Sequence, residues 1–338
     1  MKVLLTGGAG YIGSHTLLEL IKKSFDVTVV DNLVNSSFEA VKRVQLISGN
    51  HIDFLPMDLL DKKEINKLFY KHDFDTVIHL AGLKAVSESI ESPLTYYENN
   101  ISGTINLCNA MMNHGVNNLI FSSSATVYGN PSELPLKEES SITCATHPYG
   151  QTKLTIEKIL MDLSESNPHW NSVILRYFNP GGAHHSGHIG EDPNGIPNNL
   201  IPFISQCAAG RRKELTIFGN DYYTHDGTCI RDYVHVVDLA IGHVAALSKI
   251  KERPGGVIYN LGTGKGSSVL EVIDTFERVN EVKIPYVFGP RRAGDVAESY
   301  TDPTKANKEL KWRAVGTLED ICQDAWNWQK QNPLGYDA

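Results

Sequence analysis

Residues 3–13, VLLTGGAGYIG, join a short apolar run to a cluster of glycines, and they decide how the fold is expected to begin. Gly8, Gly10 and Gly13 match the spacing GxGxxG, and Gly7, Gly10 and Gly13 also match GxxGxxG. Glycines let the backbone turn sharply and approach a pyrophosphate, which binds to the amides and dipole at the N-terminus of the following helix. The apolar run predicts a strand and the pattern after it predicts a helix, which is the context that this motif requires.

A second apolar run, DVTVVD (26–31), ends in Asp31. A carboxylate at this distance from the glycines can accept hydrogen bonds from the ribose hydroxyls of adenosine, and it repels a 2′-phosphate. The sequence therefore favours NAD over NADP as a cofactor. A simpler role, in which the aspartate only caps a turn at the end of a strand, stays open.

Further apolar runs alternate with helical patterns along the first half of the chain. Strands are expected in 52–55, 76–82, 118–129 and 172–179, and helices notably in 94–114 and 149–163. This alternation predicts an α/β fold of the Rossmann type, with a doubly wound parallel sheet whose ligands bind at the carboxyl ends of the strands. The residues at such ends are expected to line one crevice, and they are Asp58, Ala81, Gly82, Ser122 to Ser124 and Tyr177 to Asn179.

The composition is typical of a globular protein with a substantial core. Of the 338 residues 41% are hydrophobic and 21% are charged, and the net charge is −8. This charge speaks against a general nucleic-acid or anionic-membrane surface. No apolar stretch approaches the ~18 residues of a membrane span, and the start, MKVLLTGG, is far short of a signal-peptide core. The five scattered cysteines, without a CxxC pair, fit a reducing cytoplasm and argue against a disulfide framework or a thiolate metal site.

The segment PYGQTK (148–153) places Tyr149 and Lys153 on one helical face, after a proline suited to a first turn. The spacing alone also fits an ordinary surface pair, but Ser124 ends a strand at the same crevice. For tyrosine to act as a base near neutrality its pKa must fall by roughly 3, or about 4 kcal/mol. One positive charge about 5 Å away supplies around 3 kcal/mol at an effective dielectric near 20. Lys153 and an oxidised nicotinamide together are therefore sufficient.

The histidines of AHHSGH, His184, His185 and His188, suggest a metal site at first sight. The proline and glycines at 180–182, with Gly187, make a helix there improbable. A polar loop and no metal are expected.

Taken together, TGGAGYIG, Asp31, Asp58, HLAG, SSSATVYG and YGQTK resemble the extended short-chain dehydrogenase/reductase family. The resemblance narrows in the second half to the UDP-glucose (UDP-galactose) 4-epimerases and covers essentially the whole chain. The segments that carry it are RYFNPGGAH (176–184), GEDPNGIPNNLIP (190–202), FGNDYYTHDGTCIRDYVHVVDLA (218–240), YNLGTG (259–264) and PRRAGD (290–295). It implies interconversion of UDP-galactose and UDP-glucose at C4 through a transient 4-keto sugar, with tightly bound NAD.

The resemblance also implies roles for individual residues. Tyr149 is implied as the catalytic base, Ser124 as the partner of the sugar 4-hydroxyl, and Lys153 as the residue that binds the nicotinamide ribose and lowers the tyrosine pKa. The implied NAD site consists of Gly7, Gly10, Tyr11, Ile12, Gly13, Asp31, Asn32, Asn35, Ser36, Asp58, Leu59, Leu80, Ala81, Gly82, Lys84, Asn99, Ser122, Tyr149, Lys153, Tyr177 and Phe178. The implied UDP-sugar site consists of Ser124, Thr126, Tyr149, Phe178, Asn179, Asn199, Leu200, Thr216, Phe218, Arg231, Tyr233, Arg292, Asp295 and Ser299.

Two residues depart from the family pattern: Leu80 replaces a common Phe and Ser299 a frequent Tyr. A small residue at position 299 is implied to leave room for a 2-acetamido group. Acceptance of UDP-N-acetylglucosamine and UDP-N-acetylgalactosamine is therefore expected as well. The family also implies a homodimer through the helices near 94–114 and 149–163.

For the domains we expect an NAD-binding Rossmann domain over 1–178, joined by 230–250, and a smaller UDP-sugar domain over 179–338. Two other functions remain to be weighed. A sugar-nucleotide 4,6-dehydratase would need an added Asp-Glu pair after the strand-end hydroxyl residue, where this chain has Ala125-Thr126. A non-catalytic, NAD-sensing regulator would not need Tyr149, Lys153 and Ser124 together.

Overall fold

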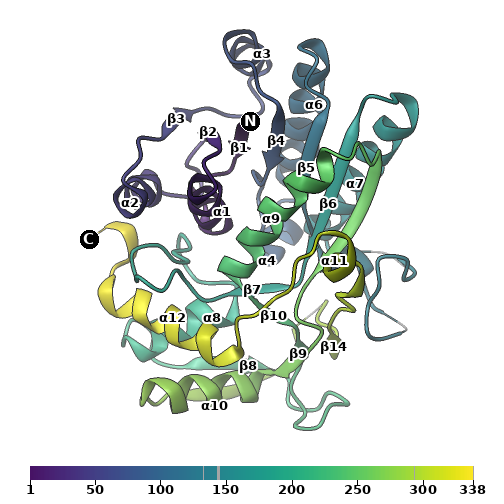
Figure 1. The fold of residues 1–338 in the computed structure, drawn as a ribbon. Helices are drawn as coiled ribbons and strands as arrows, with labels where there is room; N and C mark the ends of the chain where they lie inside the picture. The colour runs from purple at the N-terminus through teal and green to yellow at the C-terminus, as the bar shows by residue number, and fades with distance from the viewer. Residues whose placement is uncertain (132, 143–144, 293, 338) are drawn as a thin grey trace.

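The fold is built on a seven-stranded parallel sheet (Figure 1). The computed structural model describes residues 1–131, 133–142, 145–292 and 294–337. Across the sheet the strands follow the order β11-β6-β5-β4-β1-β2-β3. They are β1 (Lys2–Thr6), β2 (Asp26–Asp31), β3 (Asp53–Pro56), β4 (Thr76–His79), β5 (Asn118–Ser124), β6 (Asn171–Tyr177) and β11 (Gly256–Leu261). The Rossmann-type, doubly wound fold predicted from the sequence is confirmed.

The strands differ from the sequence prediction in their ends and in one member. β4 stops at His79 and β5 stops at Ser124, before the ends of the apolar runs. Beyond β5 the Ser124 side chain accepts a hydrogen bond from the backbone N–H of Thr126 at 3.2 Å, and a 3₁₀ turn, η2 (Ala125–Tyr128), begins. The edge strand β11 pairs with β6 although no strand was expected there.

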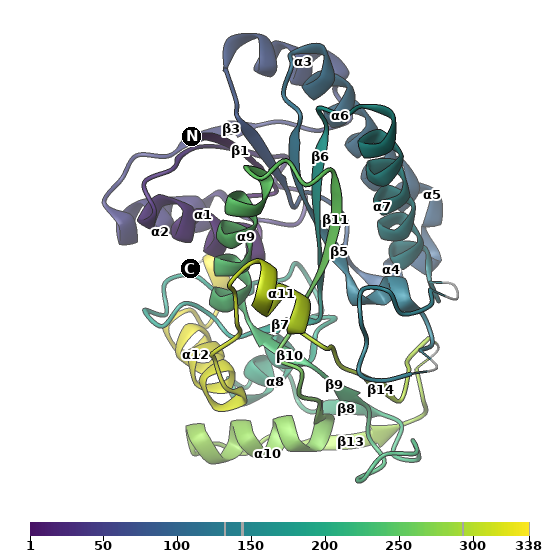
Figure 2. The same ribbon diagram turned by 45° about the vertical axis from the view of Figure 1, so that its right-hand side comes forward.

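Helices cover both faces of the sheet (Figure 2). The side chains of β1 alternate between the faces, so that Val3 and Leu5 pack against α1, α2 and α9, while Leu4 packs against α3, α6 and α7. The helices are α1 (Tyr11–Lys22), α2 (Phe38–Ser48), α9 (Val236–Ile250), α3 (Lys62–Lys71), α6 (Gly103–Asn113) and α7 (Pro148–Ser166). Both faces of the sheet are therefore covered by helices, and ligands can bind only at the ends of the strands.

The helix expected over 94–114 is interrupted in its first half. It consists of α5 (Pro93–Tyr96), a π-helical turn η1 (Tyr97–Ser102) and α6. The buried side chain of Asn100 explains the irregular turn, because its amide bonds the backbone N–H of Leu83 at 2.8 Å and the hydroxyl of Thr152 at 3.1 Å. π-Helical turns are common at functional sites, and this one contains Asn99, a residue of the implied NAD site.

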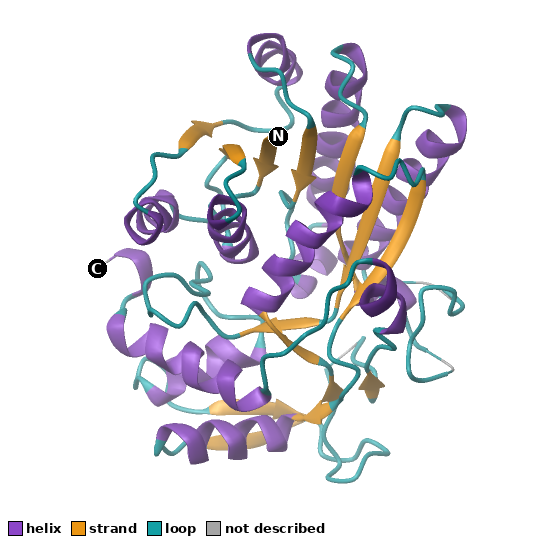
Figure 3. Ribbon diagram, viewed as in Figure 1, coloured by secondary structure: helices purple, strands orange, loops and turns teal. Residues whose placement is uncertain are grey.

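A second region lies beyond the carboxyl ends of the sheet strands (Figure 3). Short strands and amphipathic helices enclose its own core, which includes Ile204, Phe276 and Ile321. The strands form the groups β7 (Asn179–Gly181) with β10 (Tyr233–His235), β9 (Ile230–Arg231) with β12 (Ser267–Ser268) and β14 (Glu298–Ser299), and β8 (Leu215–Phe218) with β13 (Tyr286–Gly289). The helices are α8 (Leu200–Ala208), α10 (Val269–Asn280) and α12 (Leu318–Gln331).

The chain crosses between the two regions more than once. After β10 it returns to the large sheet as α9, which packs on α1, and as β11. Two short helices, α4 (Val86–Glu91) and α11 (Thr304–Glu309), follow β4 and β14. None of the helices within the described ranges has the length and apolar character needed to cross a bilayer.

Candidate active site

A cavity of about 680 Å³ lies between the carboxyl ends of the sheet strands and the second region. It is lined by the glycine turn 7–13, by the ends of β2, β4, β5 and β6, by the first turn of α7, and by segments of the second region. Every residue that the sequence analysis assigned to catalysis, to NAD or to the UDP-sugar lines this cavity. The individual roles of these residues stay predictions.

The glycine turn brings backbone close to backbone at one end of the cavity. Gly7 has a φ of +74°, and a Cβ on it would lie 2.5 Å from the backbone nitrogen of Ala81. A Cβ on Gly13 would lie 2.1 Å from the carbonyl oxygen of Gly7. Among the described residues no side chain caps α1 at its N-cap, Gly10, which lines the cavity. The N-terminal amides of α1 are therefore available to an anion.

Asp31 stands beside this turn, at the end of β2. One carboxylate oxygen accepts the backbone N–H of Ala9 at 3.0 Å, and the other accepts the hydroxyl of Ser36 at 2.8 Å. Further along, the Asp58 carboxylate accepts a hydrogen bond from the amide of Asn32 at 3.0 Å. These carboxylates and amides form a polar rim next to an anion-binding helix end, which suits the ribose of an adenine dinucleotide.

Tyr149, Lys153 and Ser124 meet at the middle of the cavity. The ammonium of Lys153 is buried, donates to the carbonyl oxygen of Ser122 at 2.7 Å, and lies 6.0 Å from the centroid of the Tyr149 ring. Burial lowers the pKa of Lys153 to about 8. Burial also raises the pKa of Tyr149, and a side-chain hydrogen bond with Ser124 lowers it in part. In the absence of a further positive charge the Tyr149 phenol therefore stays protonated at neutral pH.

A buried ion pair supports this catalytic end of α7. Glu157 lies on the same helical face as Lys153, one turn further on, and pairs with Arg176 of β6 at 2.7 Å. Both side chains are almost fully buried, and Glu157 also accepts a hydrogen bond from Ser123. The guanidinium donates in addition to the hydroxyl of Tyr128 at 2.9 Å. The charges are thus paired and saturated, which a buried ion pair requires.

Two arginines line the far end of the cavity. Arg292 donates to Asp295 at 2.9 Å, and Arg231 lies 3.8 Å from the same carboxylate. The guanidinium of Arg292 also lies 5.6 Å from the centroid of the Phe218 ring. A cationic wall with a flat aromatic neighbour suits a nucleoside diphosphate.

Glu191 and His147 are among the cavity-lining residues that sequence reasoning missed. The Glu191 carboxylate accepts hydrogen bonds from Lys84 at 2.9 Å and from Asn199 at 2.8 Å, so it links the two walls. His147 stacks on Tyr149. Glu191 lies in GEDPNGIP, which was singled out as a motif, whereas no sequence signal distinguished the residue before Pro148.

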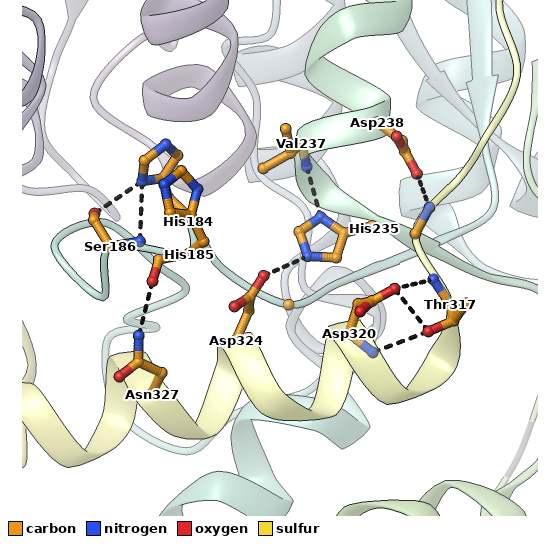
Figure 4. Close-up of polar contacts among 12 residues, drawn as sticks. His184, His185, Ser186, His235, Val237, Asp238, Thr317, Asp320, Asp324 and Asn327 are labelled. Atoms are coloured by element: carbon orange, nitrogen blue, oxygen red, sulfur yellow. Dashed lines mark hydrogen bonds and ion pairs between the residues drawn. The ribbon is translucent and has the colours of Figure 1, made fainter. Parts of the chain in front are cut away.

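The histidine-rich segment at 184–188 is a loop tied to α12 (Figure 4). His184 bonds the Ser186 hydroxyl at 2.8 Å, and the carbonyl oxygen of His185 accepts from the Asn327 amide at 2.9 Å. Burial lowers the pKa of His184 to about 4. In the described part of the chain no three or more side chains of the metal-binding types form a group that could hold an ion.

Comparison with known proteins also indicates an enzyme that acts on sugar nucleotides. A family model described as GDP-mannose 4,6 dehydratase matches residues 4–325. UDP-glucose 4-epimerase 1 of Oryza sativa subsp. japonica is 55% identical over 342 residues, covering 99% of this chain and 96% of the relative. UDP-glucose 4-epimerase of Bacillus subtilis (strain 168) is 53% identical, covering 100% of this chain and 99% of the relative. The chain belongs to the UDP-glucose 4-epimerase family.

A solved structure of this family has the same fold. UDP-glucose 4-epimerase from Bifidobacterium longum in complex with NAD⁺ and UDP superposes with a TM-score of 0.96, at 49% identity, and covers 99% of this chain and 100% of its own. The resemblance inferred from the sequence motifs is therefore confirmed, and it extends over both regions.

The dehydratase alternative is not favoured, although the description of the family model names that chemistry. After Ser124 the chain continues with Ala125 and Thr126 in a 3₁₀ turn, and the Thr126 hydroxyl donates to Ser124 at 3.0 Å. Neither side chain can deliver the extra acid and base that elimination of water needs. The full-length relatives named above are epimerases.

Proposed function

We propose that this protein interconverts UDP-galactose and UDP-glucose by inverting C4 of the hexose, with NAD held throughout the reaction. The observation that carries the proposal is the meeting of Tyr149, Ser124 and Lys153 between an anion-binding helix end and a pair of arginines in one cavity. The first feature suits the dinucleotide and the second suits the diphosphate of the substrate. The family membership of the chain supports the same reaction.

The residues present fit NAD. The uncapped N-terminus of α1 would hold the pyrophosphate, and Asp31 would accept hydrogen bonds from the adenosine ribose. Lys153 would bond the ribose next to the nicotinamide. An oxidised nicotinamide held there would supply an acceptor and donor of hydride for C4 of the hexose.

The chain itself moves one proton and holds the sugar. Tyr149 removes the proton of the 4-hydroxyl and gives it back after the sugar has turned. Ser124, which bonds the phenol, would also bond the same hydroxyl and align it. Arg231 and Arg292 would hold the diphosphate in place, so that the hexose can turn without leaving the cavity.

The test is to incubate the purified protein with UDP-galactose and no added NAD. We expect NAD⁺ to copurify and UDP-glucose to appear without any supplied cofactor. A protein that needs stoichiometric NAD and accumulates NADH would be a dehydrogenase. A protein that binds NAD but changes no sugar nucleotide would be a regulator.

We infer that N-acetylated UDP-hexoses are substrates as well. Ser299 of β14 lines the cavity, whereas Tyr300 lies against Gly266 and points elsewhere. The neighbouring Tyr300 could close the space beside Ser299 only if the strand moved by one residue, and the position of its ring disfavours this. The small hydroxymethyl group leaves a volume that a tyrosine ring would fill.

This inference predicts a switch of specificity in Ser299→Tyr. The wild type should turn over both UDP-glucose and UDP-N-acetylglucosamine, and the variant should lose the N-acetylated substrate selectively. A bulky group in a pocket changes discrimination by ~1–3 kcal/mol, so kcat/KM on the two substrates measures the effect. Equal loss of both activities, or none in the wild type on the N-acetylated sugar, would overturn it.

We further propose a homodimer that pairs the helices near 94–114 and 149–163. Apolar side chains on the first of these segments are exposed, with Leu94 81% and Ile105 39% accessible. Covering such side chains is favourable. Light scattering of the wild type and of Ile105→Glu measures the effect: the wild type should have twice the chain mass, and the variant should shift toward the monomer.

The remaining proposals concern the domains and the compartment. Residues 1–178 with 230–250 are proposed to bind NAD and 179–338 to bind the UDP-sugar, which the positions of the two anion-binding ends support. A cytoplasmic location is supported by Cys108, Cys207, Cys229 and Cys322, which are all buried and unpaired.

A further inference from the structure

His147 lies at the point where the chain enters the catalytic helix. It is the N-cap of α7, and its Nδ1 accepts the backbone N–H of Gly150 at 3.1 Å. The imidazole is largely buried and lines the same cavity as Tyr149. An N-cap of this kind satisfies one of the otherwise unpaired amides of the first helical turn.

The same imidazole stacks on the phenol of Tyr149. The two rings are parallel to within 3°, and their centroids are 5.9 Å apart. Tyr149 belongs to the first turn of α7, so the cap fixes the backbone that carries the phenol, and the stack restrains the plane of its ring. One side chain thus restrains the base in two independent ways.

Both contacts depend on the protonation state of the histidine. Because the Gly150 N–H is the donor, Nδ1 must be unprotonated to accept it. A proton on Nδ1 would turn the acceptor into a second donor and would place a positive charge at the N-terminus of a helix, where the dipole disfavours it. The charged groups that face the ring come from the opposite segment, and they are Arg292 and its ion-pair partner Asp295.

We propose that His147 is a positioning residue for Tyr149: the neutral imidazole holds the first turn of α7 and the plane of the phenol, and protonation of His147 releases both. This proposal rests on the proposed function, because it assigns Tyr149 as the base. It goes beyond that function in giving the reaction a second ionisation that does not belong to any group in contact with the sugar.

The surroundings of His147 determine the pH at which it is protonated. Burial lowers the pKa of His147 below 6.5, Arg292 lowers it further, and Asp295 raises it in part. The ring is therefore neutral at pH 7. The neutral form, and the stability that the cap contributes, are complete above pH 6.5 and are lost as the pH falls through the lowered pKa.

The diagnostic measurement is the acid limb of log(kcat/KM) against pH. Protonation of Tyr149 alone gives a limiting slope of 1, and protonation of His147 adds a second ionisation, so the slope should approach 2 at the acid end. His147→Asn keeps a capping side chain but cannot titrate, and its slope should stay at 1. His147→Ala lacks both the cap and the stack at every pH, so its kcat should already be at least about tenfold low at pH 8 and its slope should stay at 1.

The chain supplies a matched control in a second histidine N-cap. His235 caps α9, and its Nδ1 accepts the backbone N–H of Val237 at 3.1 Å, while Nε2 faces Asp324 at 3.1 Å (Figure 4). It does not line the cavity. His235→Asn should leave the slope of 2 in place, so that a general effect of removing a histidine cap is separated from the effect at Tyr149.

Each outcome has one meaning. A slope that stays at 2 in His147→Asn, or that falls to 1 in His235→Asn as well, overturns the role of His147. A wild type without epimerase activity overturns the proposed function instead, and the inference falls with it. The NAD content and melting temperature of each variant, measured alongside, exclude a loss of fold as the cause of a changed profile.

Discussion

Helices α7 and α9 begin in the same way, on opposite faces of the sheet, but they bury different side chains. Each starts with a histidine N-cap. Along α7 the residues at intervals of four, Tyr149, Lys153 and Glu157, form a polar stripe in which Lys153 and Glu157 are buried. Along α9 the buried face is mostly apolar and packs on α1, with Leu239 and Leu247 in the core. A histidine N-cap therefore begins a helix that carries catalytic residues in one case and a helix that packs in the core in the other.

The largest difference should be in stability and concerns the inner end of the polar stripe. Glu157→Gln leaves the Arg176 charge buried and unpaired, which should lower the free energy of unfolding by about 3–5 kcal/mol. The control lies at the end of α9, where Lys249 pairs with the exposed Glu252. Glu252→Gln should cost less than about 1 kcal/mol. Urea unfolding of both variants measures the contrast, and equal losses would contradict it.

The next effect is on the rate and concerns the outer end of the stripe. Tyr149→Phe should lower kcat at least about a hundredfold and leave KM nearly intact, as loss of a general base does. Val237, two residues after the cap of α9, is the position that corresponds to Tyr149. Val237→Ala should keep kcat within about twofold of the wild type. Near-normal turnover in Tyr149→Phe would mean that the base lies elsewhere.

Lys153, which lies between Tyr149 and Glu157 on α7, should make the rate fall at high pH. Its pKa is lowered to about 8 by burial, so its positive charge is present below that pH and is lost as the pH rises through it. The rate should fall above pH 8 for this reason. Lys153→Arg keeps its charge and should move this fall out of the measured range, while Lys153→Ala should be slowed about tenfold. The alanine variant should also retain less NAD, measured by absorbance after gel filtration.

The smallest effect should come from the cap of α9. Asp324→Ala removes the partner of His235 and should lower the free energy of unfolding by about 1 kcal/mol. The turnover number should not change, since neither residue reaches the cavity. A changed pH–rate profile in this variant would show that the two helix ends are not as separate in function as their surroundings indicate.

The sequence predicted those parts of the molecule that follow from local sterics. The glycine turn and Asp31 could be read from residues 3–31, because a close approach of backbones demands glycine whatever surrounds it. The polar stripe of α7 could be read in part from the spacing of Tyr149 and Lys153. The substrate side was placed by resemblance, and its residues do line the cavity.

The parts that could not be predicted depend on partners far away in the chain. The π-helical turn exists because Asn100 bonds Leu83 and Thr152, and neither partner is visible from a helical pattern. The strand β11 forms by pairing with β6, about eighty residues earlier. The stack of His147 on Tyr149 depends on the extended backbone of His147 before α7, which the sequence pattern does not reveal.

The return of the chain to the large sheet has a consequence for the order of events during synthesis. Helix α1 packs against α9, and β6 pairs with β11, so residues of the first half find their partners only after residue 261 has been made. Until then the part of α1 that α9 covers stays exposed, on a chain that emerges from the ribosome at ~5–20 residues per second. Fragments that end before β11 should therefore be captured by chaperones or proteases, and the cofactor half should not be obtainable by truncation.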